Sequence, residues 1–110
     1  MGVDNELDQH MQDLWKRYLP QQRSRLETVS RAIQALEADE LNAELRRHAA
    51  AEAHNLAGSL GTFGLHTASE IAQRIEIILA SNDALGSPEA CELEAALARL
   101  HHEMKKRSMV

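Results

Sequence analysis

The sequence predicts an all-α protein, an up-and-down four-helix bundle with an N-terminal capping helix. The chain of 110 residues has 17 alanines and 15 leucines, and both residue types favour helix. Only two prolines and five glycines are present to interrupt helices, and apolar residues recur at three- and four-residue spacing along most of the chain. Aromatic residues, at 3%, are too few for a β-sandwich or barrel.

We expect one domain over residues 1–110, with its core bundle over about residues 20–107. A chain of this size buries one modest core, which leaves no room for an enclosed active site beside a cofactor-binding fold. A net charge of −5 argues against broad nucleic-acid binding. The single cysteine, Cys91, excludes an internal disulfide and cysteine-based zinc patterns. Because no apolar run approaches the ~20 residues of a membrane span and no signal peptide is evident, we expect a cytoplasmic protein.

End signals divide the chain into five helical segments. The first runs from Asp4 to about Leu19 and is the expected cap, because Pro20 disfavours helix at the residue before it. Gly64 is expected to end the third segment in the left-handed conformation, and Pro88 suits the first turn of the last. The four bundle helices are expected over about residues 20–38, 39–63, 65–80 and 88–107.

The segment over residues 39–63 carries a histidine that core packing does not require. At about 100° per residue, His54 points away from the apolar stripe of this helix. That stripe consists of Leu45, Ala49, Leu56, Leu60 and Phe63. The neighbours of His54 on its own face are small: Ala50, Ala51, Ala57, Gly58 and Gly61. The spacing therefore predicts an exposed imidazole on a surface of small side chains.

Two interpretations of this histidine are open. A lone exposed histidine on a helix usually has no special role, and alanine needs no functional reason in a helix. However, Gly58 and Gly61 each cost about 1 kcal/mol relative to alanine inside a helix, on a face that the core does not use. A surface without large side chains would let another protein's active site approach His54 closely, so we take these five small residues as a candidate docking surface.

The stretch AHNLAGSLGTFGLHTASEIAQRIE, residues 53–76, resembles the histidine-containing phosphotransfer (HPt) domain. That family has a hydrophobic residue two positions after its histidine, glycine at four and ten positions, and often a small residue at seven. The matching residues here are His54, Leu56, Gly58, Gly61 and Gly64. The helix lengths and order over about residues 20–107 are also similar to those of the family.

One position departs from the family pattern. The lysine that the family usually carries three residues after the histidine is Ala57 here. The resemblance implies that this lysine helps to hold the phosphoryl group, so its absence bears directly on the chemistry. Arg47 on the same helix face, or Arg74 on the next helix, could replace it.

The resemblance implies that His54 accepts a phosphoryl group from the aspartate of a response-regulator receiver domain and passes it on. A receiver domain, a hybrid histidine kinase, or both are then the expected partners of a monomeric chain, with no nucleic acid and no membrane. The sequence has no nucleotide-binding motif and no acidic cluster suited to Mg²⁺. We therefore expect a phosphocarrier rather than an enzyme, with no cofactor of its own and with Mg²⁺ on the receiver.

Such chemistry requires an acceptor that holds the proton on Nδ1 of the imidazole and leaves Nε2 to attack. The helices flanking Gly64 are expected to form an antiparallel hairpin, and His54 lies ten residues before that turn. The residue opposite should follow the turn by roughly 8–12 positions. Gln73 and Glu76 lie in that window, and Glu76 is the stronger acceptor because its carboxylate is charged.

The remaining histidines do not form a recognisable metal site, because their spacings do not bring two of them to one helix face. They are His10, His48, His66, His101 and His102. Two other functions stay open. The chain could be an unphosphorylated adaptor that binds or inhibits a receiver, which the absence of lysine at Ala57 would favour, or a structural bundle with no receiver partner.

Overall fold

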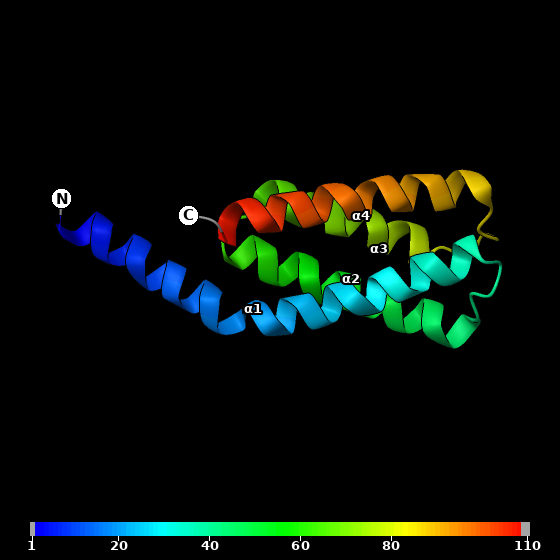
Figure 1. Ribbon diagram of the computed structural model, residues 1–110, viewed down its shortest axis with the longest axis horizontal. Helices are drawn as coiled ribbons and strands as arrows, with labels where there is room; N and C mark the ends of the chain where they lie inside the picture. Colours follow the sequence, from blue (N-terminus) through cyan, green and yellow to red (C-terminus); the bar gives the residue numbers. More distant parts are fainter. Residues whose placement is uncertain (1, 109–110) are drawn as a thin grey trace.

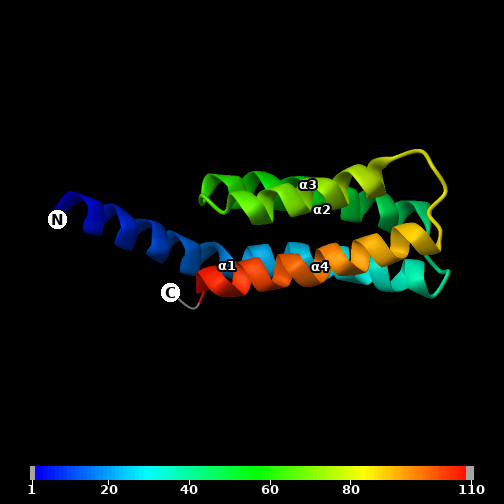
Figure 2. The same ribbon diagram turned by 90° about the horizontal axis from the view of Figure 1, so that it is seen from above.

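The computed structural model describes residues 2–108, with side chains from residue 6 to residue 107. It contains four helices, α1 (Gly2–Glu37), α2 (Ala43–Thr62), α3 (His66–Ala80) and α4 (Ser87–Ser108), and the described part of the chain has no strand. Successive helices run antiparallel and α4 returns to contact α1 (Figure 1). Seen from above, α2 and α3 lie on one side of the molecule and α1 and α4 on the other (Figure 2). The predicted all-α, up-and-down bundle is confirmed.

The predicted boundary between residues 19 and 20 is wrong, because α1 continues through Pro20. Proline lacks an N–H, so the carbonyl of Lys16 loses its helical donor at this point. Lys16 and Pro20 are both exposed, and water can solvate that carbonyl. Trp15 and Leu26, on either side of the proline, are buried in the core, and this packing holds the helix together. Figure 1 shows that α1 changes direction along its N-terminal half and extends beyond the bundle.

The part of α1 around Trp15 and Tyr18 packs on one end of the bundle, although it is not a separate helix. Trp15 is fully buried, and its ring meets that of Phe63 edge-on at 5.3 Å between centroids. Tyr18 contacts the same phenylalanine at 6.4 Å. Phe63 lies at the end of α2, so these aromatic contacts tie α1 to the α2–α3 turn.

The helices α1 and α2 are each followed by a residue in the left-handed conformation. Gly64 has φ of 81°, and Leu65 donates its backbone N–H to the carbonyl of Leu60, which is the arrangement expected after a helix C-terminus. Asp39 has φ of 58° and ends α1 in the same manner. The prediction that Asp39 begins the next helix is therefore wrong. Asn42 has that role instead, and its side chain accepts a hydrogen bond from the N–H of Leu45 at 2.7 Å.

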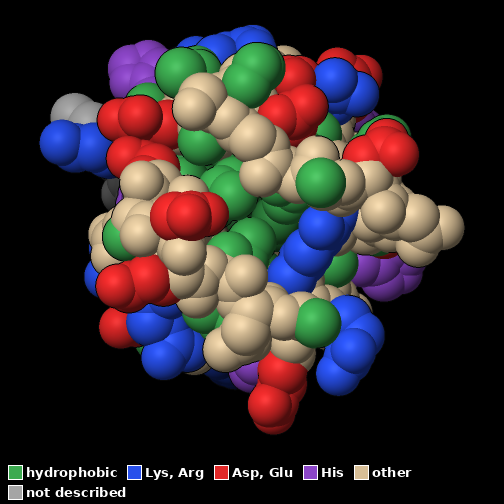
Figure 3. All heavy atoms as spheres, turned by 90° about the vertical axis from the view of Figure 1, so that its right-hand side faces the viewer, with side chains coloured by type: hydrophobic (Ala, Val, Ile, Leu, Met, Phe, Trp, Pro, Cys, Tyr) green, Lys and Arg blue, Asp and Glu red, His purple; other side chains and the backbone are tan. Residues whose placement is uncertain are grey.

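The opposite end of the bundle is closed by the loops before α2 and α4. Figure 3 views this end and shows hydrophobic side chains at its centre, surrounded by charged ones. Arg46 donates to the backbone carbonyls of Leu79, Ser81 and Asp83 at 2.6–2.9 Å, which satisfies carbonyls that the end of α3 leaves without helical donors. At the start of α4, the N–H of Gly86 donates to Glu89 and lowers the pKa of that carboxyl.

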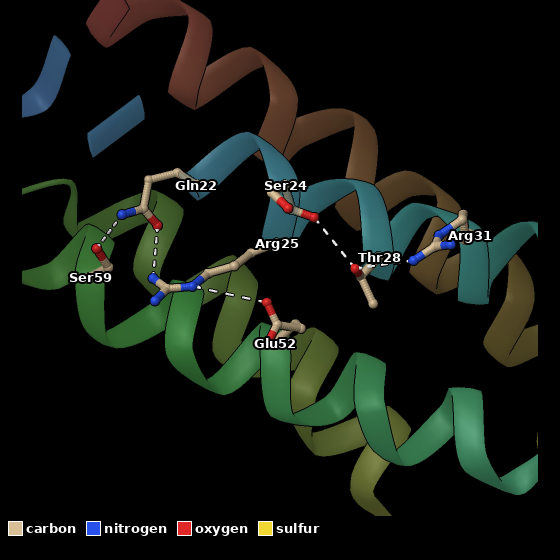
Figure 4. Close-up of polar contacts among 7 residues, drawn as sticks. All are labelled: Gln22, Ser24, Arg25, Thr28, Arg31, Glu52 and Ser59. Carbon is tan, nitrogen blue, oxygen red and sulfur yellow. Dashed lines mark hydrogen bonds and ion pairs between the residues drawn. The ribbon is translucent and has the colours of Figure 1, made fainter. Parts of the chain in front are cut away.

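The core uses one face of α2 together with apolar residues of the other three helices. Ala49, Leu56 and Leu60 are buried as the helical spacing predicts. Towards α1, the amide of Gln22 donates to Ser59, and Arg25 lies 4.0 Å from the Glu52 carboxylate (Figure 4). These contacts orient α2 from the α1 side. Within the described residues, no helix is long and apolar enough to cross a membrane.

Candidate functional site

His54 lies in the middle of α2, on the side that faces α3 rather than α1. Its side chain is 71% exposed, which is high for an imidazole within a packed helix pair. The helix places it there because the core face of α2 is taken by alanine and leucine at helical spacing. His54 is therefore open to a partner from outside while its backbone is held rigidly in the bundle.

The structure brings Glu76 of α3 to His54. Oε2 of Glu76 lies 2.9 Å from Nδ1 of the imidazole. An ionised carboxylate can only accept a hydrogen bond, so Nδ1 carries the proton in this contact. The neutral ring then has its lone pair on Nε2, at the opposite side of the exposed imidazole. This geometry suits a nucleophile whose tautomer is set by a neighbouring acceptor.

Gln73, the other acceptor that the sequence suggests, makes no hydrogen bond to His54. Its amide nitrogen lies 3.5 Å from the hydroxyl of Ser69, at the limit of a hydrogen bond. Gln73 nevertheless lines the same shallow hollow of about 470 Å³ as His54 and Glu76. It contributes to the surface around the imidazole without orienting it.

The predicted docking surface is partly exposed and partly buried. Ala51 and Gly58 are exposed, and Ala50 and Gly61 are half-buried. The placement of Ala57 on an open surface is wrong, because its side chain is only 5% exposed. The cause is α3, which packs against this side of α2 so closely that Ser69 donates its hydroxyl to the carbonyl of Ala57 at 2.8 Å. A projection of one helix does not reveal such coverage.

Two residues of the site were missed from the sequence. Ile77 is 59% exposed and lines the hollow beside Glu76. Ser69 also lines this hollow and is buried, with 7% exposed. The helical spacing of α3 gives a signal for Ile77, since it lies off the stripe formed by Ile71, Ile75 and Ile78. Ser69 has no such signal, because its significance depends on what α2 places opposite it.

Comparison with known families decides the classification. The family model described as the Hpt domain matches residues 13–104, which include all of α2 and α3 and most of α1 and α4. The chain belongs to the Hpt domain family. Neither a curated protein nor a solved structure matches it. The matched region begins at residue 13, within α1 and upstream of Pro20.

Membership of this family identifies the class of function. Hpt domains are phosphocarriers of phosphorelays rather than kinases, and they act with response-regulator receivers. In this Hpt domain the position of the usual lysine is the buried Ala57. The two arginines considered as replacements differ in their availability. Arg74 donates to Glu92 at 2.7 Å, and this hydrogen bond and charge pair raise the pKa of Arg74. Arg47 is exposed on α2, two turns before His54.

The other histidines of this Hpt domain lie apart from the site. All five are exposed, and the described residues contain no group of three side chains placed to hold a metal ion. His101 and His102 line a separate hollow between α1 and α4. The pairing with Glu76 therefore distinguishes His54 from the histidines on the rest of the described surface.

Proposed function

We propose that the protein is a histidine phosphotransfer protein of a two-component phosphorelay, in which His54 takes a phosphoryl group from a receiver aspartate and passes it on. The observation that carries the proposal is the 2.9 Å contact between His54 Nδ1 and Glu76 Oε2 on a ring that is otherwise exposed. It presents Nε2 to an incoming partner in the unprotonated form that nucleophilic attack requires.

The transfer needs no proton movement on this chain. Nε2 of His54 attacks the phosphorus of the aspartyl phosphate, the new N–P bond forms, and the bond from phosphorus to the aspartate oxygen breaks. The aspartate leaves as a carboxylate with the bonding electron pair. Because Nδ1 keeps its proton, the phosphorylated ring is cationic, and its charge lies against the carboxylate of Glu76. The same steps in reverse deliver the group to the next receiver.

The surface around His54 supports close approach of another protein. A Cβ built on Gly58 would have no neighbour within 4 Å, so the backbone of α2 is bare one turn from the imidazole. Ile77 provides an exposed apolar side chain at the edge of the same hollow. A small, mostly bare surface with one apolar contact suits a transient signalling complex, which buries little area.

The charge of the transferred group must be balanced mainly by the partner. Phosphoryl transfer depends on positioning and on neutralising charge at the phosphoryl oxygens. Ala57 provides no cation, and Arg74 already pairs with Glu92. We therefore expect the receiver domain to supply Mg²⁺ and the cationic side chains, and this chain to supply the nucleophile and its orientation.

A transfer assay tests the proposal. A panel of receiver domains, each phosphorylated beforehand, is mixed with the protein, and phosphate on the protein is followed as an acid-labile, alkali-stable modification. We expect transfer from at least one receiver and none to the His54→Gln variant. His101→Gln is the matched control, because it removes an exposed histidine away from the site. Phosphorylation that persists in His54→Gln would overturn the proposal.

A binding measurement made beside the transfer assay separates the second candidate, an unphosphorylated adaptor. This candidate is favoured by the presence of Ala57 where the family usually has lysine. Receiver binding measured by titration calorimetry would survive His54→Ala in an adaptor, and no receiver would transfer phosphate. In a phosphocarrier, transfer is lost in that variant even where binding is retained.

A further inference from the structure

Two contacts between α2 and α3 lie in the same register. His54 faces Glu76, and Gly61 faces Ser69. Seven residues separate His54 from Gly61 on α2, and seven separate Ser69 from Glu76 on α3. Seven residues are nearly two full helical turns, or about 10 Å along the axis. The buried contact and the exposed contact are therefore successive meeting points of one helix–helix seam.

The buried contact between Gly61 and Ser69 restricts how α3 can lie against α2. A Cβ added to Gly61 would lie in van der Waals contact with Ser69, 3.4 Å from its hydroxyl oxygen, so a side chain larger than alanine at position 61 would push against the serine. That hydroxyl donates to the carbonyl of Ala57 at 2.8 Å, and Ser69 is only 7% exposed. A hydroxyl on a one-carbon side chain reaches a main-chain carbonyl of a neighbouring helix only over a narrow range of spacing and rotation. The contact thus restricts both.

The exposed meeting point cannot determine its own geometry. The side chains of His54 and Glu76 are 71% and 30% exposed, and pairs of this kind compete with water and contribute little by themselves. With both side chains fixed, a displacement of α3 by about 1 Å along the contact would lengthen the 2.9 Å distance beyond hydrogen-bond range. The distance between Nδ1 and the carboxylate must therefore be maintained from within the seam.

We propose that Ser69, seated against Gly61, is a positioning residue that holds α3 at the spacing and register which place Glu76 at Nδ1 of His54. Gln22 and Arg25 orient α2 from the α1 side through Ser59 and Glu52, and Ser69 orients α3 relative to it. The consequence for phosphoryl transfer rests on the proposed function, whereas the effect on the imidazole does not.

The tautomer of His54 reports this positioning in the isolated protein. Two-bond ¹H–¹⁵N NMR spectra, recorded at a pH where the ring is neutral, distinguish Nδ1–H from Nε2–H imidazole. Glu76 favours the Nδ1–H form, and free histidine favours the other. In Gly61→Val the added side chain pushes against Ser69, and we expect the ratio of Nδ1–H to Nε2–H forms to fall about two- to fivefold, the effect of one hydrogen bond from a neutral ring to a solvent-exposed carboxylate.

Gly58→Val is the matched control. It makes the same change one turn closer to His54, where an added Cβ meets nothing within 4 Å, and we expect the wild-type ratio. Ser69→Ala provides a second variant that keeps the fold if Gly61→Val does not, because alanine fits the space and favours helix. Its expected effect is in the same direction and smaller. In a Glu76→Ala background, Ser69→Ala should change the ratio no further.

The outcomes are distinct from those of the transfer assay. A wild-type ratio in folded Gly61→Val and in Ser69→Ala would overturn the positioning role, whether or not receivers transfer phosphate to His54. Equal losses in Gly58→Val and Gly61→Val would also overturn it, since the effect would then not pass through the seam. A lowered ratio in Gly61→Val alone, with no transfer from any receiver, would support the positioning role and count against the proposed function.

Discussion

The α2–α3 seam and the α1–α4 seam differ in the size of the side chains that meet there. Along α2–α3, Ala57 and Gly61 oppose Ser69, and a buried hydroxyl reaches the neighbouring backbone. Between α1 and α4, the larger side chains of Leu26 and Met104 line a hollow of about 530 Å³, and the two backbones approach at fewer positions. Small residues bring two helices close enough for polar groups to meet in one geometry.

Exposed histidines lie along both helix pairs, α2–α3 and α1–α4. Exposure alone therefore does not distinguish His54 from the others. His101 and His102 line the α1–α4 hollow together with Arg23, Glu27 and Lys105, and the described ion pairs include neither of these two histidines. His54 has a carboxylate at 2.9 Å instead. The proposed transfer to His54 is favoured by this opposing acceptor, which the packing of α3 on α2 supplies.

Removing the histidine of each seam gives the largest expected contrast. We expect His54→Gln to reduce phosphorylation by a receiver to background, and His101→Gln and His102→Gln to leave it near the wild-type level. All three side chains are exposed, so the free energy of unfolding should change by no more than about 0.5 kcal/mol. Labelled phosphate on the protein and urea denaturation measure the two effects. Loss of phosphorylation in His101→Gln or His102→Gln would show that transfer also depends on the α4 histidines.

Truncation in the core beneath the α1–α4 hollow should affect stability rather than transfer. Leu26 is 4% exposed, and Leu26→Ala is expected to lower the free energy of unfolding by about 2–4 kcal/mol through lost burial and the cavity left behind. Urea denaturation measures this loss. At a temperature where the variant remains folded, the transfer rate should match that of the wild type, and a marked fall would show that this seam also supports the site.

Removing the acceptor from the α2–α3 seam should slow transfer without preventing it. In Glu76→Ala the proton on Nδ1 loses its partner, and we expect the transfer rate to fall about two- to fivefold, the effect of one solvent-exposed charged pair. Glu76→Gln should retain more activity, because its amide oxygen still accepts from Nδ1. Rapid-quench measurements compare the three proteins. A Gln variant slower than the Ala variant would contradict the role of the acceptor.

The two glycines of the seam should respond differently to the same small change. Gly58→Ala is expected to raise the free energy of unfolding by about 0.5–1 kcal/mol, because an added methyl favours helix and meets no neighbour. Gly61→Ala should gain less, since its methyl would lie 3.4 Å from Ser69. Thermal unfolding of both variants measures the difference. Destabilisation by Gly58→Ala would show that its surroundings are more crowded than the structure indicates.

Local sequence signals predicted most of the helices. They failed where core packing overrode a signal and where one residue type can play two roles at a helix end. Gly64 was identified as a helix end because few other residues adopt its conformation readily. Asp39 was assigned to a helix start, but aspartate also tolerates the left-handed conformation that ends α1. The break expected at Pro20 does not occur, because buried residues on both sides hold α1 together.

The site was predictable where it depends on one helix and less so where it depends on two. The side of α2 on which His54 lies follows from its spacing to Leu56 and Leu60. Hairpin geometry narrowed its partner to two side chains of α3, of which the structure places Glu76 at hydrogen-bond distance. Ala57 was placed on the open surface because a projection of one helix cannot show what its neighbour covers.

The sequence by itself determined that the chain forms a helical bundle and that His54 lies opposite the apolar stripe of α2, because helical periodicity is a local property of the chain. Only the tertiary structure decided that α1 runs through Pro20, that Ser69 reaches the backbone of α2, and that Glu76 meets Nδ1. The reason is that spacing and register between helices arise from contacts among residues distant in sequence, where differences of a few tenths of an ångström decide which polar groups can bond.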